Sequence, residues 1–255
     1  MSVFAAAAMQ VYHSHRPIYL ADSFRGLPKP RVESSRPDEA WYTDTKINQT
    51  LAVGEQHVLG NFDTYGVPRD NVQTVPGYFV HGLPPVREKM LARGEKIAIL
   101  RLDGDMYDST IDILYNMYDL VAVGGYIIID DFGWDHATKP AGGEDEAVPL
   151  FGAKKAVLDF RALHGIEDKD HAFHDVDGLC AWFRKTREVN LQRDRYLASL
   201  KSHGQKPLMP SPRLTNADYH ALMLSYNAAV GVAETSYGNT RLIEKAQENY
   251  VMHAR

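Results

Sequence analysis

The sequence predicts an α/β fold built around a mostly parallel sheet, and two observations in residues 96–133 support this prediction. Two short apolar runs, residues 97–100 and 126–129, have the composition of strands that are buried on both faces. The segment between them repeats its apolar residues at helical spacing. A strand–helix–strand crossover makes the two strands parallel, so their carboxyl ends lie at one edge of the sheet, where open α/β sheets bind ligands.

The composition predicts a globular protein with one domain and an appendage, or with two small domains. The chain has 255 residues, and 44% of them are hydrophobic, which is enough to bury a core. The formal net charge of -5 argues against nucleic acid as the main partner, because a phosphate backbone requires a basic surface.

The cysteine count and the N-terminal region indicate the cellular compartment in which the protein is expected. The single cysteine, Cys180, excludes an internal disulfide and a zinc site built from cysteines. It fits a reducing compartment, so we expect a cytoplasmic protein. The apolar run at residues 3–9 is too short to span a membrane and follows no basic residue. We therefore expect neither membrane insertion nor a signal peptide.

The pattern of the first 95 residues predicts alternating helices and strands. Apolar spacing and breaking residues predict helices at residues 2–15 and 46–65, strands at residues 18–21 and 72–75, and a turn with a short helix over residues 82–93. Residues 25–45 are polar and rich in proline and serine, which predicts a long loop. We expect that loop to form a flap on the substrate side, although a disordered connection is the simpler alternative.

The central stretch places acidic residues where each of its strands ends. The first strand stops at Asp103-Gly104-Asp105. Ser109 is in a position to cap the following helix, and Gly124-Gly125 is expected to end it. The second strand runs into Asp130-Asp131, so we expect four carboxylates at one edge of the sheet.

The C-terminal part begins regularly and then changes in composition. Residues 153–164 predict a helix, and residues 172–176 and 179–183 predict a hairpin that turns at Asp177-Gly178. The segment from residue 187 onward is charged and broken by prolines. We therefore predict a core domain of residues 1–186 and a helical extension of residues 187–255. The extension's predicted parts are a helix at 187–203, a linker at 204–212 and an amphipathic helix at 216–233.

The clustered carboxylates predict a site for a hard divalent cation such as Mg²⁺. In extended backbone, Asp103 and Asp105 share a face with their Cα atoms roughly 6–7 Å apart. Carboxylates gathered in this way repel one another, and a cation would keep them ionised. Histidine and cysteine, which zinc or copper would need, are not interleaved with them. The simpler alternatives are that Asp-Gly-Asp forms a turn and that Asp-Asp caps the next loop.

Asp22 and Ser23 follow the strand predicted at residues 18–21. In doubly wound sheets, an acidic residue at this place often accepts hydrogen bonds from a ribose. The alternative is an aspartate that forms a turn with the serine after it. The sequence alone does not favour the ribose contact.

Four motifs occur in the order seen in one enzyme family. They are residues 21–28 (ADSFRGLP), 75–79 (VPGYF), 100–107 (LRLDGDMY) and 124–131 (GGYIIIDD). Together with the helix and hairpin that follow them, these motifs resemble the macrocin O-methyltransferase family over about residues 2–185. Members of that family methylate sugar hydroxyls of macrolide and aminocoumarin antibiotics, using S-adenosylmethionine and Mg²⁺.

The resemblance implies a Rossmann-like class I methyltransferase sheet and a role for each acidic residue. Asp105, Asp130 and Asp131 would hold the metal, and Asp103 would be the general base that takes the proton from the acceptor hydroxyl. Asp22 would contact the ribose of the cofactor, and we place Ser23 beside it in the cofactor site. The expected partner is a small, sugar-containing substrate, and a homo-oligomer is compatible with the sequence.

The sequence departs from the family pattern at its start. Family members have a first, central strand that ends in an acidic, glycine-rich loop around the methionine end of the cofactor. The sequence has no counterpart of this strand before Ser2. We therefore expect an empty position between the strands that begin at Ile18 and Ile97, and we interpret the sequence as truncated. The alternatives are that another segment fills the position or that the protein no longer binds the cofactor.

Two other functions remain open at this stage. The first is a metal-dependent glycosyltransferase acting on nucleotide sugars, with Asp103-Gly104-Asp105 as its metal-binding motif. That function leaves Asp130-Asp131 without a role. The second is a non-catalytic, methyltransferase-like binding protein, which the missing glycine-rich loop would favour.

Overall fold

The computed structural model describes residues 2–31, 38, 42–133, 152–167 and 172–201. The chain divides into units of residues 1–213 and 214–255, and all described residues belong to the first. Its helices are α1 (Ser2–Val11), α3 (Thr45–Leu51), α4 (Glu55–Thr64), α5 (Phe79–Arg93), α6 (Tyr107–Met117), the 3₁₀ helix η1 (Tyr118–Leu120), α7 (Gly152–Leu163) and α8 (Arg193–Lys201). Its strands are β1 (Ile18–Asp22), β2 (Val72–Pro76), β3 (Ile97–Leu102), β4 (Val121–Ile129), β5 (His174–Asp175) and β6 (Ala181–Arg184).

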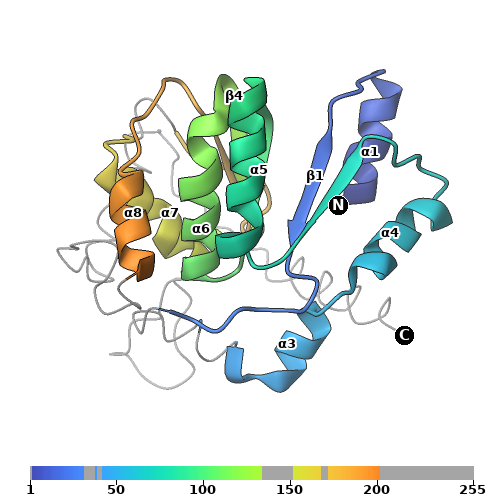
Figure 1. Cartoon of the computed structure of the whole chain (residues 1–255), viewed down its shortest axis with the longest axis horizontal. Coiled ribbons are helices and arrows are strands. Elements are labelled where there is room, and N and C mark those ends of the chain that lie inside the picture. The colour runs from blue at the N-terminus through green and yellow to red at the C-terminus, as the bar shows by residue number, and fades with distance from the viewer. Residues whose placement is uncertain (1, 32–37, 39–41, 134–151, 168–171, 202–255) are drawn as a thin grey trace. The chain divides into compact units, whose positions relative to one another are not determined.

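The strands form two sheets (Figure 1). One consists of β1 paired in parallel with β2, and the other has the order β3-β4-β6-β5. Strands β3 and β4 are parallel, and β6 runs antiparallel to both β4 and β5. The α/β fold with a mostly parallel sheet and a C-terminal antiparallel hairpin is therefore confirmed. Among the described residues, no strand pairs with both β1 and β3, in agreement with the expected empty position between them.

Helix α6 forms the centre of the core. All of its 11 residues are buried, and it packs between α5 and α7 and against β3. The ring of Tyr115 on α6 stacks on that of Tyr196 on α8, with centroids 4.7 Å apart, and meets the ring of Phe160 edge-on at 5.4 Å. Burying side chains of this size stabilises the fold by about 1.5–3 kcal/mol each. The packing fixes the N-terminus of α6, which lies beside the acidic edge of the sheet.

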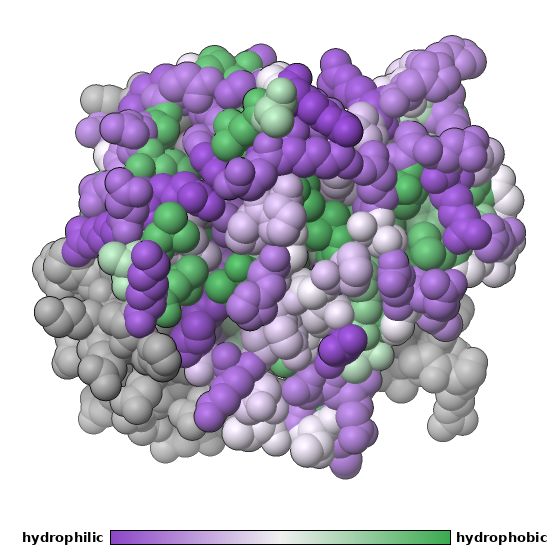
Figure 2. Space-filling view, in the orientation of Figure 1, coloured by the Kyte–Doolittle hydropathy of each residue, from purple (hydrophilic) through white to green (hydrophobic). Residues whose placement is uncertain are grey.

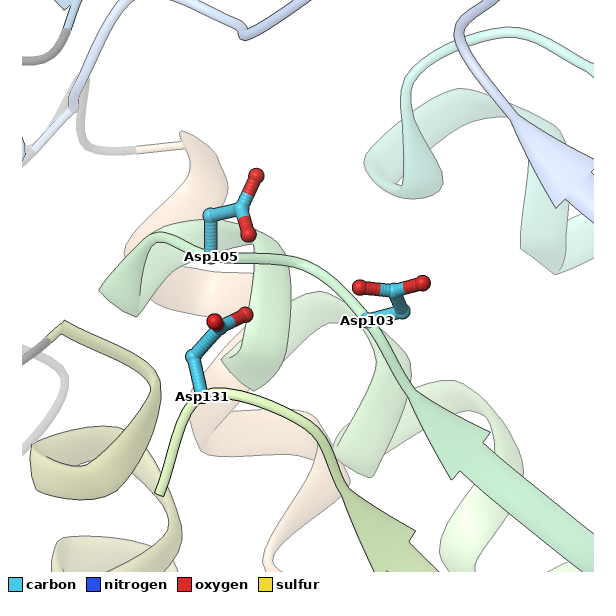
Figure 3. Close-up of side chains that lie close together, drawn as sticks. All are labelled: Asp103, Asp105 and Asp131. Atoms are coloured by element: carbon cyan, nitrogen blue, oxygen red, sulfur yellow. The ribbon is translucent and has the colours of Figure 1, made fainter. Parts of the chain in front are cut away.

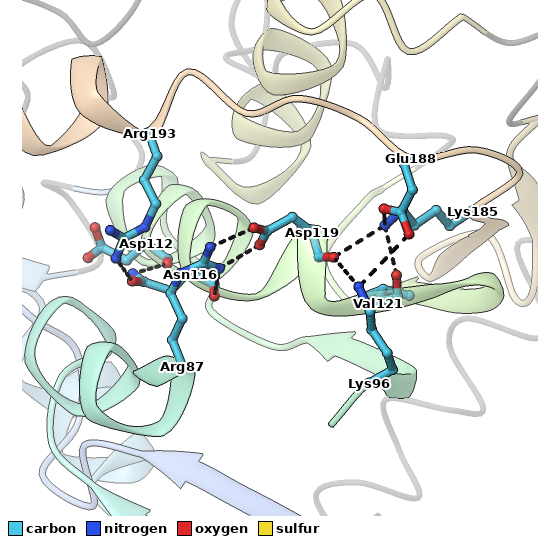
Figure 4. A network of polar contacts seen from close by, with 9 residues as sticks. All are labelled: Arg87, Lys96, Asp112, Asn116, Asp119, Val121, Lys185, Glu188 and Arg193. Carbon is cyan, nitrogen blue, oxygen red and sulfur yellow. Dashed lines mark hydrogen bonds and ion pairs between the residues drawn. The ribbon is translucent and has the colours of Figure 1, made fainter. Parts of the chain in front are cut away.

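A network of buried polar groups joins the helices that cover the sheet (Figure 4). Arg87 on α5 makes an ion pair with Asp119 and donates to the carbonyl oxygen of Asn116 at 2.8 Å. Arg193 on α8 donates to the side-chain oxygen of the same Asn116 at 3.1 Å. Lys185 is fully buried and donates to the carbonyl oxygen of Val121 at 2.7 Å. Because buried charges must be paired, these contacts set the positions of α5, α6 and α8 relative to β4.

Two predicted helix boundaries are wrong in the first half of the chain. The single helix expected over residues 46–65 is two helices, because the backbone of Ala52 leaves the helical region (ψ 67°) and Gly54 is extended (ψ 147°). In place of the turn and short helix expected over residues 82–93, helix α5 begins at Phe79 and continues through Pro84 and Pro85. Neither proline can donate the helical hydrogen bond to the residue four before it, which made this segment resemble a turn.

Two predictions in the central stretch are also wrong. Ser109 does not cap α6: the helix begins at Tyr107, whose N–H donates to the carboxylate of the distant Asp38 at 2.8 Å. Gly124-Gly125 does not end a helix, because both residues lie inside β4. A Cβ atom on Gly125 would lie 3.0 Å from the carbonyl oxygen of Ala98, so glycine permits the close approach of β3.

The segment after residue 186 is tied to the core as far as it is described. Tyr196 on α8 is 1% exposed, and α8 belongs to the same unit as the two sheets. The helix predicted over residues 187–203 is observed as the shorter α8. The linker at 204–212 and the helix at 216–233 lie outside the described residues.

The surface is mixed in polarity. On the face shown in Figure 2, hydrophobic residues appear as separate patches among hydrophilic ones. Among the described residues, no helix has both the length and the apolar character that crossing a membrane requires.

Candidate functional site

The register of the central sheet brings the acidic residues to one edge. Leu102 at the end of β3 is paired with Ile129 at the end of β4. The N–H of Asp130 donates to the carbonyl oxygen of Leu102 at 3.0 Å. Asp103 and Asp130 therefore leave neighbouring strands at the same level, as the crossover predicted.

A tight loop connects β3 to α6 and turns Asp105 toward this edge. A Cβ atom on Gly104 would lie 3.1 Å from the Cβ of Ser109, so the loop can pass this close to the helix only with glycine there. Asp105 has a left-handed backbone (φ 55°), which is uncommon for a residue with a side chain. The carbonyl oxygen of Asp105 accepts from the N–H of Ala153 at 3.1 Å, which ties the loop to the start of α7.

Three carboxylates meet at this edge (Figure 3). One oxygen from each of Asp103, Asp105 and Asp131 can be chosen so that all three lie within 4.8 Å of one another. Figure 3 shows that they come from three segments: the end of β3, the loop before α6 and the end of β4. A single ion could therefore contact all three side chains.

Asp130 points to a different partner. The Nε of Arg101 on β3 donates to one oxygen of Asp130 at 2.9 Å, and a terminal nitrogen of the same guanidinium donates to the other oxygen. The remaining terminal nitrogen of Arg101 lies 2.8 Å from an oxygen of Asp103. Arg101 therefore bridges two of the four carboxylates, and the described structure does not place Asp130 in the cluster of three.

The pKa values of the clustered carboxyls are raised. Desolvation by the surrounding protein atoms raises the pKa of Asp103 to about 6, although 51% of its side chain is exposed; the charges of Asp130 and Asp131 add to the rise, and Arg101 opposes it. Burial also raises the pKa of Asp131 to about 8 and raises that of Asp105, and the charges of neighbouring carboxylates add to both rises. Carboxyl groups with pKa values raised in this way keep their protons to a higher pH than an ordinary aspartate does.

This donor set fits a hard divalent cation. Mg²⁺ and Ca²⁺ prefer oxygen ligands, and Mg²⁺ in particular keeps waters alongside one or two carboxylates. Burial is the largest cause of the raised pKa values; the charges of neighbouring carboxylates add to it, and Arg101 opposes it. A divalent ion bound among these carboxylates would favour their ionised forms and replace their protons.

Asp22 and Ser23 lie at the end of β1 in a tight turn. The carboxylate of Asp22 accepts from the N–H of Phe24 at 2.7 Å, and the hydroxyl of Ser23 donates to the carbonyl oxygen of Gly26 at 2.6 Å. This is the turn that the simpler interpretation expected. The same two residues also line a cavity of about 190 Å³ that Asp103 and Asp105 border from the other side.

A second cavity adjoins the first. It has a volume of about 370 Å³ and shares Ser23 and Tyr78 with the smaller one. Pro76 and Gly77, at the end of β2, also line it. The two cavities together run along the carboxyl ends of β1 and β2 to the carboxyl end of β3.

The structure thus brings together most of the residues predicted from the sequence. Asp103, Asp105 and Asp131 form the cluster, Asp22 and Ser23 border the adjoining cavity, and Asp130 stands apart on Arg101. Sequence reasoning missed Arg101, although a signal existed. Arg101 is a charged residue inside an apolar strand, two positions before Asp103 and so on the same face.

Comparison with known proteins identifies relatives over the same part of the chain. The family model described as macrocin-O-methyltransferase (TylF) matches residues 1–185. The 8-demethyl-8-(2,3-dimethoxy-alpha-L-rhamnosyl)-tetracenomycin-C 4'-O-methyltransferase of Streptomyces olivaceus is 32% identical over 186 residues, which is 72% of this chain and 61% of the relative. The mycinamicin III 3''-O-methyltransferase of Micromonospora griseorubida is 31% identical over 66% of this chain and 58% of its own length. The chain therefore spans about three fifths of these relatives.

A solved structure has a similar fold. The O-methyltransferase NovP matches with a TM-score of 0.58 and 29% identity, over 73% of this chain and 67% of that protein. The match supports a Rossmann-like methyltransferase sheet for the described residues.

Proposed function

The chain belongs to the macrocin-O-methyltransferase family, and from this premise we propose that it transfers a methyl group from S-adenosylmethionine to a sugar hydroxyl, with Mg²⁺ as cofactor. The observation that carries the proposal is the cluster of Asp103, Asp105 and Asp131 beside the cavity that Asp22 lines. Two relatives support a sugar-bearing natural product as substrate, since one is named for a rhamnosyl tetracenomycin and the other for mycinamicin III.

We assign Asp105, Asp130 and Asp131 to the metal and Asp103 to the acceptor. The carboxylates of Asp105 and Asp131 already face each other. Asp130 is held by Arg101 in the described structure, so its assignment to the metal rests on the resemblance of residues 124–131 to the family motif. Asp103 is the most accessible of the cluster, with 51% of its side chain exposed. An accessible carboxylate bordering a cavity suits a general base that must reach a bound hydroxyl.

The two adjoining cavities support a cofactor site along the carboxyl ends of the strands. Asp22 stands at the end of β1, where an acidic residue can accept hydrogen bonds from a ribose. Ser23 borders both cavities and would lie beside the same part of the cofactor.

Each group at the site would have a separate role in the proposed methyl transfer. When bound, the cofactor supplies an activated methyl group, and the metal lowers the pKa of a hydroxyl held next to it. Asp103 would accept the proton of the acceptor hydroxyl while the hydroxyl oxygen bonds to the methyl carbon; the bond from that carbon to the sulfur of S-adenosylmethionine would break, and S-adenosylhomocysteine would leave. The cavity holds the reactants in contact, and this positioning supplies a large part of the acceleration.

Calorimetry and a methyl-transfer assay test the proposal. We expect S-adenosylhomocysteine to bind the protein, and Mg²⁺ to bind with an affinity that Asp131→Asn lowers at least about tenfold. Asp103→Asn should keep both binding reactions and lose methyl transfer to mycinamicin III or to the demethylated rhamnosyl tetracenomycin. Asp70→Asn is the matched control, because Asp70 is exposed and precedes β2 at its opposite end.

The outcomes separate the parts of the proposal. A protein that binds neither S-adenosylhomocysteine nor Mg²⁺ would exclude the enzyme and leave a different kind of binding protein. Full transfer activity in Asp103→Asn would remove Asp103 as the base while leaving the metal assignment intact.

A further inference from the structure

Arg101 occupies an unusual place for a positive charge. It is the only basic residue in β3, and its side chain extends toward the acidic edge with 32% of its surface exposed. Its Nε and one terminal nitrogen bind the two oxygens of Asp130, and its other terminal nitrogen lies 2.8 Å from Asp103. One guanidinium therefore holds one of the proposed metal ligands and the proposed base at once.

The two hydrogen bonds from the Arg101 guanidinium to Asp130 have a direct consequence for metal binding. Both oxygens of Asp130 accept from Arg101, and the side chain of Asp130 is only 19% exposed. A two-pronged bond between arginine and a carboxylate is among the stronger charge-assisted hydrogen bonds. A carboxylate held in this way cannot turn to a cation until the arginine releases it.

We propose that Arg101 is a positioning residue that holds Asp130 and Asp103 in the metal-free protein and releases both when a divalent cation binds at Asp105 and Asp131. The inference rests on the proposed function, because it describes how that site is loaded. Arg101 and the cation compete for the same carboxylate and repel each other at close range. The solvent-exposed part of Arg101 gives its guanidinium a way to move aside.

Release of the two carboxylates by Arg101 links metal binding to the ability of Asp103 to accept a proton. Because one guanidinium contacts both carboxylates, movement that frees Asp130 also removes the ion pair from Asp103. Asp103 would then be free to accept a proton only in the metal-loaded protein. Before the metal binds, the ion pair with Arg101 would limit contact between Asp103 and the acceptor hydroxyl.

Four proteins test this competition: wild type, Arg101→Met, Asp130→Asn and the double variant. The measurement is Mn²⁺ affinity by electron paramagnetic resonance, repeated with Mg²⁺ by calorimetry, without cofactor or acceptor. We expect Arg101→Met to bind Mn²⁺ about tenfold more tightly than wild type. In the Asp130→Asn background, the same substitution should change the affinity less than about threefold.

The comparison between the two backgrounds distinguishes the proposed competition from a general effect of charge. Loss of a positive charge alone would tighten Mn²⁺ binding by the same factor whether position 130 carries aspartate or asparagine. Equal gains in affinity in the two backgrounds would therefore overturn the inference. Unchanged or weaker binding in Arg101→Met would also overturn it. Failure of wild type to bind either ion would instead refute the proposed function.

A second variant guards against a folding defect in Arg101→Met. Arg101→Lys keeps the charge but has one ammonium group in place of the fork, so it can hold Asp130 less firmly. We expect its Mn²⁺ affinity to lie between those of wild type and Arg101→Met, with an unchanged circular dichroism spectrum. An affinity of Arg101→Lys below that of wild type would contradict the inference.

Discussion

At the scale of single residues, the acidic edge is a site whose charges are incompletely balanced. Burial and the charges of neighbouring carboxylates raise the pKa values of Asp105 and Asp131. The pKa of Asp103 is raised to about 6, from an ordinary value of about 3.9 for aspartate. These three residues therefore bind protons more tightly in the folded protein than in the unfolded chain.

The stability of the metal-free protein should depend on pH for this reason. Between about pH 4 and 8, the folded state holds more protons at these residues than the unfolded state, so raising the pH removes stability. We expect the Tm in EDTA to fall across this range and the fall to be smaller with MgCl₂, because the cation replaces the protons. Scanning calorimetry at several pH values measures both slopes.

Asp131→Asn provides the control for that prediction. The amide carries no charge, so the metal-free variant should have a higher Tm than wild type at pH 8, by roughly 2–4 °C for each kcal/mol of repulsion removed. It should also respond less to MgCl₂. A metal-free wild-type Tm that rises from pH 5 to pH 8 relative to the variant would contradict the raised pKa of Asp131.

At the scale of elements, one buried carboxylate connects three parts of the chain. Asp112 on α6 accepts two hydrogen bonds from Arg31, at 2.9 and 2.7 Å, and a third from the hydroxyl of Tyr196 at 2.7 Å. The side chain of Asp112 is 4% exposed. The segment after β1 and helix α8 are thus both attached to α6 through the same side chain.

Arg31→Met should weaken this connection strongly. The substitution leaves Asp112 buried without its cation, and breaking a buried ion pair costs about 3–5 kcal/mol. Arg31 is itself 31% exposed, so we expect a smaller loss of about 2 kcal/mol in the free energy of unfolding. Urea denaturation followed by circular dichroism measures the loss, and a change below about 0.5 kcal/mol would rule out this role.

Tyr196→Phe tests the attachment of α8 separately. It removes one hydrogen bond to a carboxylate and keeps the stacked ring, so we expect a loss of about 1.5 kcal/mol. Tyr65→Phe is the matched control, because Tyr65 is 73% exposed and should change the stability little. Equal effects of the two substitutions in urea denaturation would show that the Tyr196 hydroxyl does not hold α8.

At the scale of the whole described unit, the two sheets differ in how well they are buried. No residue of β1 or β2 is fully buried, whereas Val121, Ile127 and Ile129 of β4 are. A two-stranded sheet has little stability of its own, and β1 and β2 gain theirs from contacts such as those with α5. The part of the proposed cofactor site that Asp22 supplies therefore lies on the less stable sheet.

Hydrogen exchange should reveal this difference. We expect the amides of β1 and β2 to exchange at least about tenfold faster than those of Ile127 and Ile129, because they open without global unfolding. S-adenosylhomocysteine should slow exchange in β1 and β2 more than in β4. Equal protection of the two sheets before ligand is added would contradict the prediction.

The sequence predicted the site better than it predicted the packing around it. The rule for parallel crossovers decides where the carboxyl ends of β3 and β4 lie, so the gathering of Asp103, Asp105 and Asp131 followed from local patterns. Arg101 has two carboxylates within hydrogen-bonding distance. Which of its nitrogens binds which carboxylate depends on the positions of the side chains in the folded protein. The same holds for Asp38, which caps α6 from 69 residues away.

Helix α8 shows a second reason why prediction fell short. Its sequence, RDRYLASLK, is mostly charged or polar, so composition alone assigned it to an extension outside the core. The described part is nevertheless attached to α6, through the ring and hydroxyl of the buried Tyr196 and the hydrogen bond from Arg193 to Asn116. Patterns averaged over a segment do not detect an attachment that depends on two residues.

The left-handed backbone of Asp105 lowers the stability of the protein, while its carboxylate serves the proposed metal site. A residue with a side chain loses about 1 kcal/mol relative to glycine in this conformation. Glycine at position 105 would relieve that strain, and asparagine at position 131 would relieve the repulsion. Directed evolution for heat resistance alone would thus favour substitutions that dismantle the acidic edge, and selection on thermal tolerance needs a parallel screen for metal binding.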